Sequence, residues 1–379
     1  MKKIVLAISM SHLLTEVYFL MHLVLIPVFL EEFNLSLFEV SFIVTVPTAI
    51  GLVMNFFSGF MVDRIGAKPI LLLGMILQGF GGVIAAGSWT VVTLIFGLTC
   101  ISVASSFYHN SGLSTISRSL MPNKLSKVMG FHNAMGAGGA SLGLLTLTLA
   151  LTYGHWRSAY IVWVIPIWIW SLFLLKMRHL PYYEKNENDN SPTKSILTKD
   201  FVSFLSSMGI RQAGATIILT FMTTYMVFIR GFSEATASFI FTLGPPIGIL
   251  SSLFAGYLGF RLGDKKVLML VILGAAGTII LMPFTSTTIS LIIVFLCFAF
   301  FKDSVWAPFS SITAKLTPSN RRGLAYSLSM STQQSIIAFT PPIAAKFIET
   351  TSLNAMFPLS FILLIISTII LNFSSKKYN

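Results

Sequence analysis

The stretch "GFMVDRIGAKP" (59–69) is a short polar interruption between two long apolar blocks, and the chain contains it twice. The second copy, "GYLGFRLGDKK" (256–266), lies 197 positions further on. The residues that match at this spacing are Gly59, Arg64, Gly66 and Lys68 in the first copy and Gly256, Arg261, Gly263 and Lys265 in the second. Because the matches fall on polar loop residues, they favour a duplicated unit over chance similarity between apolar helices.

The composition is that of a membrane protein. Of 379 residues, 55% are apolar and only 10% are charged, whereas a soluble domain carries about 25% charged residues. The apolar residues come in blocks that match the roughly 20 residues of a membrane-spanning helix, not the alternating strands of about 10 residues in a barrel. We predict an all-α membrane protein with twelve spans, at 4–30, 37–62, 69–88, 90–116, 126–153, 156–177, 200–229, 234–260, 265–285, 286–315, 320–348 and 353–374.

The spans divide into two pseudo-symmetric six-helix bundles, predicted at 1–177 and 200–379. Between them lies the longest polar stretch, "RHLPYYEKNENDNSPTKSILTK" (178–199), which we interpret as a cytoplasmic linker. A parallel duplication of six-helix halves is one of the architectures of secondary transporters.

The net charge of +12 does not indicate nucleic-acid binding, because most of the 25 Lys and Arg residues fall in segments on one side of the predicted membrane. This is the positive-inside bias that orients helices. Both termini are basic, so we expect a multi-pass protein of the cell membrane with both termini in the cytoplasm.

The first copy of the repeated stretch resembles motif A of the major facilitator superfamily, and with twelve spans and a central linker the resemblance covers the whole chain. It implies that Gly59, Asp63, Arg64, Gly66 and Lys68 form a gate, with the two glycines allowing close helix approach and a tight turn. It also implies that Asp63 contacts the start of the eleventh span near 322–323, where the helix dipole favours an anion. For the two basic residues, simple positive-inside anchoring is an equally weighted alternative. Phe260 replaces the Asp in the second copy.

Two further stretches resemble the fosmidomycin-resistance-like group of that superfamily: "SHLLTEVYF" (11–19) and "SSFYHNSGLSTISRSLMPNKLSKVMG" (105–130). The resemblance implies drug or antibiotic efflux. The fifth span contains "GAGGASLG" (136–143) without the Gly-Pro pattern of antiporters. We expect this glycine run to serve close helix packing rather than dinucleotide binding, because no strand precedes it.

Ionisable residues occur inside the predicted spans, where each costs about 2.5–3.5 kcal/mol on insertion scales. They are Glu16 in span 1, His109 in span 4, Arg211 in span 7, and Lys302 and Asp303 in span 10. The family resemblance implies that these four spans line the central cavity. His12 and Glu16 are four residues apart, so they share one helical face.

We expect the acidic and imidazole groups to carry protons, with Glu16, His12 and Asp303 as the proton-coupling residues. Substrate binding is predicted at Glu16, His109, Arg211, Lys302 and Gln333. The alternative is that the charges form structural ion pairs that hold the halves together. His12, Glu16 and His109 are residue types that can bind a metal, but their spacing does not require a metal site. We expect neither a metal nor a cofactor.

The sequence therefore predicts a secondary active transporter that works by alternating access and is coupled to protons. Its expected substrate is a small organic solute, with an anion favoured. The alternatives are a drug or antibiotic efflux antiporter and, in another class, a non-transporting receptor or scaffold on a transporter fold. No ATP-binding loop of the GxxxxGK[ST] kind and no catalytic motif is present, so neither a primary pump nor an enzyme is expected. We expect a monomer whose partners are its substrate, protons and the lipid bilayer.

Overall fold

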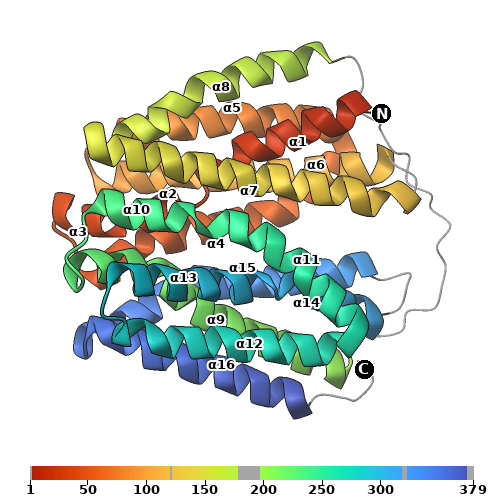
Figure 1. Ribbon diagram of the computed structural model, residues 1–379. Coiled ribbons are helices and arrows are strands. Elements are labelled where there is room, and N and C mark those ends of the chain that lie inside the picture. The colour runs from red at the N-terminus through yellow and green to blue at the C-terminus, as the bar shows by residue number, and fades with distance from the viewer. Residues whose placement is uncertain (1, 120–121, 178–196, 318–321, 374–379) are drawn as a thin grey trace. The chain divides into compact units, whose positions relative to one another are not determined.

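The structure is a computed structural model that describes residues 2–119, 122–177, 197–317 and 322–373. The described residues form two compact units (Figure 1). The first contains α1 (Lys2–Glu16), α2 (Met21–Val24), α3 (Ile26–Glu32), α4 (Leu37–Ile65), α5 (Ala67–Ala86), α6 (Val91–Ser119), α7 (Pro122–Tyr153), α8 (Trp156–Lys176) and α10 (Glu234–Thr242).

The second unit contains most of α9 (Lys199–Phe228), whose last residues belong to the first unit, and the helices that follow α10. These are α11 (Gly244–Leu262), α12 (Asp264–Leu281), α13 (Thr288–Asp303), α14 (Trp306–Leu316), α15 (Arg322–Thr350) and α16 (Met356–Phe373), with short 3₁₀ segments at Met282–Phe284 and Leu353–Ala355. Most of the expected linker lies outside the described residues.

Eleven helical segments among the described residues are long and apolar enough to cross a membrane, against twelve predicted spans. The remaining predicted span, 320–348, corresponds to α15, which is a continuous helix of 29 residues. At 1.5 Å per residue such a helix is about 43 Å long. It is less apolar than the others because it carries the polar run "SMSTQQS" (329–335).

The repeated stretch adopts the same turn in both units. Gly66 ends α4 and Gly263 ends α11, with φ of 90° and 89°. The Gly66 N–H donates to the Val62 carbonyl and the Gly263 N–H to the Gly259 carbonyl, both at 3.0 Å. A positive φ is strained for any residue with a Cβ, so each turn needs its glycine.

The lysine that follows each turn caps another helix. Lys68 Nζ donates to the carbonyls of Leu175, at 3.0 Å, and Met177, at the end of α8. Lys265 Nζ donates to the Asn372 carbonyl in α16 at 3.1 Å. The last carbonyls of a helix have no intrahelical partner and carry partial negative charge, so an ammonium group stabilises them. Lys68 therefore has a structural role that the sequence did not indicate.

Two helices are interrupted directly after an acidic residue. α1 ends at Glu16 and is followed by four turn residues before α2, and α13 ends at Asp303, with Ser304 and Val305 in a turn before α14. Because the backbone leaves the helix at these points, both carboxyl groups lie where the regular hydrogen-bond ladder stops.

The predicted glycine packing is confirmed between α7 and α1. A Cβ added at Gly139 would lie 2.1 Å from the Leu13 carbonyl oxygen, and one at Gly143 would lie 1.8 Å from the Val17 carbonyl oxygen. No side chain fits at these distances, so the two backbones touch here. This contact places α7 directly against the segment of α1 that carries His12 and Glu16.

Candidate functional site

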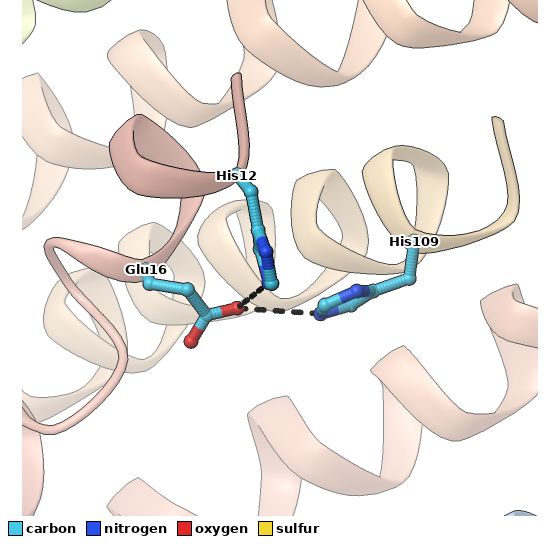
Figure 2. Close-up of side chains that lie close together, drawn as sticks. All are labelled: His12, Glu16 and His109. Atoms are coloured by element: carbon cyan, nitrogen blue, oxygen red, sulfur yellow. Dashed lines mark ion pairs between the residues drawn. The ribbon is translucent and has the colours of Figure 1, made fainter. Parts of the chain in front are cut away.

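Glu16 lies between two histidines in the first unit (Figure 2). Its Oε1 is 3.6 Å from His12 Nε2, one turn earlier on α1, and 3.3 Å from His109 Nε2 on α6. The shared helical face predicted for His12 and Glu16 is confirmed, and the structure adds His109 to them. The Glu16 side chain is 12% exposed and that of His109 is 39% exposed, so His109 is the more accessible of the two.

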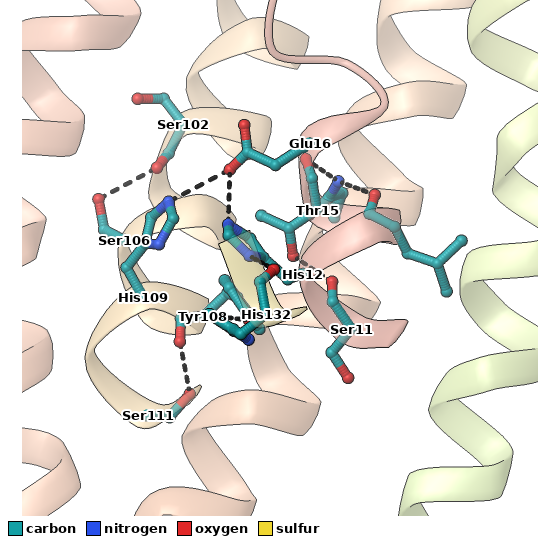
Figure 3. A network of polar contacts seen from close by, with 12 residues as sticks. Ser11, His12, Thr15, Glu16, Ser102, Ser106, Tyr108, His109, Ser111 and His132 are labelled. Carbon is teal, nitrogen blue, oxygen red and sulfur yellow. Dashed lines mark hydrogen bonds and ion pairs between the residues drawn. The ribbon is translucent and has the colours of Figure 1, made fainter. Parts of the chain in front are cut away.

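The other ring nitrogen of His12 is also bound. His12 Nδ1 lies 2.9 Å from the carbonyl oxygen of His132 on α7, and the two imidazole rings stack with centroids 4.3 Å apart. Tyr108 stacks on His12 as well, at 5.3 Å. Figure 3 shows these side chains from α1, α6 and α7 gathered around one another. His132, which sequence reasoning did not place in the site, is fully buried and holds His12.

α5 supports the end of α1 through Gln78. Its buried amide group donates to the carbonyls of Leu14 and Thr15, at 2.8 and 2.9 Å. These carbonyls belong to the last turn of α1, where helical partners are missing. Sequence reasoning missed Gln78, and the available signal was an amide side chain in an otherwise apolar span.

In the second unit, Arg211 meets the end of α13. Arg211 is 4% exposed, and its guanidinium group donates to Gln212 Oε1 at 2.9 Å and to the Lys302 carbonyl at 2.6 Å. Lys302 Nζ forms an ion pair with the neighbouring Asp303. These three side chains carry one more positive than negative formal charge. The guanidinium group also stabilises the negative end of the α13 dipole.

Gln333 on α15 is buried, and its Nε2 has no hydrogen-bond partner among the described residues. The hydroxyl groups of Thr220 and Thr224 on α9 are also buried without a hydrogen-bond partner among the described residues. An unsatisfied buried donor costs about 1–3 kcal/mol. Such groups are natural positions for hydrogen bonds to a bound molecule.

The expected gate is only partly visible. The side chains of Asp63 and Arg322 lie outside the described residues, so their expected contact is not described. Arg64 is exposed. A Cβ added at Gly59 would meet no described atom within 4 Å, so the close helix approach expected at this glycine is not found, whereas Gly66 forms the expected turn.

The second copy of the motif forms an ion pair with α14. Asp264, one residue after the turn glycine, accepts a hydrogen bond from Ser311 and pairs with Lys315 of α14 at 2.9 Å. These three residues and the exposed Phe260 line a cavity of about 730 Å³ beside the turn. The second copy, which has Phe260 in place of an acid, thus carries its acidic group at position 264.

The ligand atoms of His12, Glu16 and His109 all lie within 4.8 Å of one another. A tetrahedral zinc site with bonds of about 2.1 Å places its ligand atoms about 3.4 Å apart. The contacts of Glu16 with the two histidines are near that value, but the set as a whole is wider than a closed site. The expectation of no metal stays a prediction.

Comparison with protein families gives the assignment. The sequence pattern described as Major Facilitator Superfamily matches residues 8–211 and 204–377. The chain belongs to the major facilitator superfamily. As a member of this family of non-enzymatic transporters, it is a multi-pass membrane protein. The finer resemblance to the fosmidomycin-resistance-like group is not shown.

Individual relatives within the superfamily are distant. The chain is 22% identical over 204 residues to the riboflavin transporter RibZ of Clostridioides difficile, covering 54% of this chain and 44% of that protein. It is 24% identical over 165 residues to the hexuronate transporter of Escherichia coli K12, covering 43% and 38%. The matches thus span less than half the length of each relative.

The fold of the superfamily is matched over almost the whole chain. A mutant of the nucleoside transporter NupG superposes with a TM-score of 0.83 at 15% identity, over 98% of this chain and 100% of that one. A bacterial homologue of the human lysosomal transporter Spinster gives a TM-score of 0.81 at 13% identity, over 100% and 97%. At these identities the likeness concerns the fold.

Proposed function

We propose that this protein is a proton-coupled transporter of a small organic anion. It would work as a monomer in the cell membrane, with both termini in the cytoplasm. The cluster of Arg211, Lys302 and Asp303 carries the proposal for an anion. Its net formal charge is +1, and the buried Arg211 donates hydrogen bonds to two neutral oxygen atoms, Gln212 Oε1 and the Lys302 carbonyl. A carboxylate or phosphate group would neutralise the excess and accept charge-assisted hydrogen bonds.

The coupling group in this proposal is Glu16 with its two histidines. A carboxyl group between imidazoles exchanges protons readily, and the partly exposed His109 gives it a route to water. Asp303 is the corresponding acid of the second unit, paired with Lys302. Protonation is coupled to transport when the partners of these groups differ between the inward-open and outward-open states.

Alternating access would arise from movement of the segments 1–177 and 200–379 about the linker 178–199. The motif residues Gly59, Asp63, Arg64, Gly66 and Lys68 would act at the gate. Gln333 would contribute to substrate binding through its amide nitrogen, which has no hydrogen-bond partner among the described residues. The hexuronate and riboflavin relatives supply two test solutes, one of them a carboxylate.

The test is uptake by protein reconstituted in liposomes with an imposed pH gradient. Radiolabelled glucuronate and riboflavin serve as probes, with ethidium as a cationic drug. We expect gradient-driven uptake of the anion, and a loss of roughly tenfold or more in Arg211→Gln, because charge-assisted hydrogen bonds are worth about 1.5–3 kcal/mol. Arg261→Gln, at an exposed position, is the matched control.

The coupling role is tested with Glu16→Gln, using the exposed acid Glu31→Gln as its control. We expect the Glu16 variant to lose gradient-driven accumulation. Full accumulation in that variant would remove Glu16 from coupling. Transport of ethidium but not of glucuronate would favour the drug antiporter over the anion transporter. The absence of flux for every probe would favour a non-transporting receptor or scaffold.

A further inference from the structure

The hydrogen bonds around His132 determine where its proton lies. The Tyr108 hydroxyl donates to the Ile8 carbonyl at 3.1 Å, so it accepts from His132 Nε2, 3.3 Å away. The other ring nitrogen of His132 then accepts from the Ser9 hydroxyl at 3.5 Å. His132 is therefore a neutral imidazole with its proton on Nε2, and both of its ring nitrogens are occupied.

The same reasoning determines the proton of His12. A carbonyl oxygen only accepts, so the 2.9 Å contact between His12 Nδ1 and the His132 carbonyl requires a proton on Nδ1. A neutral His12 therefore presents the lone pair of Nε2 to Glu16 Oε1. An ionised carboxylate facing that lone pair puts two acceptors against each other.

We propose that the His132 carbonyl locks His12 in the Nδ1–H tautomer, so that His12 and Glu16 together keep one proton between Nε2 and Oε1. The proton lies on the carboxyl group with a neutral His12, or on Nε2 in an ion pair with the carboxylate. His12 is the inner end of the relay because its second nitrogen is fixed, and His109 is the outer end. This inference rests on the proposed function for its role in coupling.

Among the described contacts of α1, His109 is the titratable group that can share this proton, because its Nε2 lies 3.3 Å from the same Oε1 of Glu16. The ring neighbours from α6 are Tyr108 and His109, and the neighbour from α7 is His132. The nearest contact from α5 is the Gln78 amide group. From α8, Trp170 donates to the Ser11 hydroxyl.

Gly136 maintains the lock by leaving room for the ring. A Cβ added there would lie 2.4 Å from His12 Cε1 and 2.7 Å from Nε2, so an alanine must push the imidazole aside. Gly138, two residues later on the same helix, has no described atom within 4 Å of an added Cβ. Gly136 is therefore a positioning residue for His12, and Gly138 supplies a control of identical chemistry.

The decisive experiment is nitrogen-15 NMR of histidine-labelled protein in lipid vesicles. The His12 signal is assigned by its loss in His12→Asn. We expect the neutral form of His12 to carry its proton on Nδ1 in the wild type and in Gly138→Ala, and to lose this preference in Gly136→Ala. A neutral His12 protonated on Nε2 in the wild type overturns the inference.

A transport assay tests the role of the tautomer in coupling separately from the proposed function. We expect glucuronate accumulation driven by a pH gradient to fall on the order of tenfold or more in Gly136→Ala, because small misplacements of a reacting group are costly. Gly138→Ala should stay within about twofold of wild type. Unchanged accumulation in Gly136→Ala, with its tautomer preference lost, overturns the role in coupling. An Nδ1–H signal in a protein that carries none of glucuronate, riboflavin and ethidium supports the tautomer and removes the proposed function.

Discussion

Glu16 and His109 face each other at 3.3 Å, and this contact links the interrupted end of α1 to α6. The two residues are 93 positions apart, so only the packing of α6 on α1 brings them together. His109 is the partly exposed member of the pair, which makes it the point of exchange with water.

We therefore expect His109→Asn to lower proton-driven solute accumulation by roughly tenfold while leaving exchange without a gradient unchanged, because the relay loses its accessible end. The measurement compares the two modes of transport in the same liposomes. His22→Asn, which changes a histidine outside the Glu16 cluster, should retain both modes. Equal loss of both modes in His109→Asn would place this residue in substrate binding instead.

Gly143→Ala should destabilise the first unit, since the new methyl group would collide with the Val17 carbonyl oxygen 1.8 Å away. Overpacking of this kind costs about 1–3 kcal/mol. Thermal unfolding in detergent, followed by tryptophan fluorescence, should show a clear drop in Tm. Gly138→Ala should leave the Tm near wild type, and the same result for Gly143→Ala would mean that α7 and α1 are not in close contact.

The two cap lysines should have similar effects on stability when removed. Lys68→Met and Lys265→Met each leave helix-end carbonyls without their ammonium partner, at a cost of about 0.5–2 kcal/mol. The neighbouring Lys266 is exposed, and Lys266→Met is the control. Stability of both cap variants equal to that of the control would contradict the capping role.

Arg211→Lys tests whether the geometry of the guanidinium group matters beyond its charge. Lysine keeps the positive charge but lacks the planar fork that binds Gln212 and the Lys302 carbonyl together. We expect the apparent affinity for glucuronate to fall by about tenfold, with a smaller change in maximal rate. A variant with wild-type affinity would show that only charge is needed.

Much of the site followed from single residues in the sequence. Charged residues in apolar blocks indicated Glu16, Arg211 and the Lys302–Asp303 pair because such groups are costly in lipid. Helical spacing alone placed His12 beside Glu16. The resemblance to motif A implied a tight turn at the glycines of the first copy, and the structure has this turn at Gly66, where φ is 90°.

Other features depend on tertiary contacts that no local pattern encodes. The break after Glu16 falls in "VYFL" (17–20), which contains neither Pro nor Gly. The bond from His12 to the His132 carbonyl requires α7 to pack on α1, and Lys68 reaches α8 across 107 positions. The polar run in α15 looked like part of an ordinary span, although this helix is less apolar than the eleven others.

The cap lysines also bear on biosynthesis. Lys68 precedes Leu175 by 107 positions in the sequence, and Lys265 precedes Asn372 by the same number. Each cap forms only when the ribosome has made the acceptor helix, which is α8 for Lys68 and α16 for Lys265. The Lys68 cap can therefore form before most of the second unit has been translated. The chain can thus fold in two successive stages during membrane insertion.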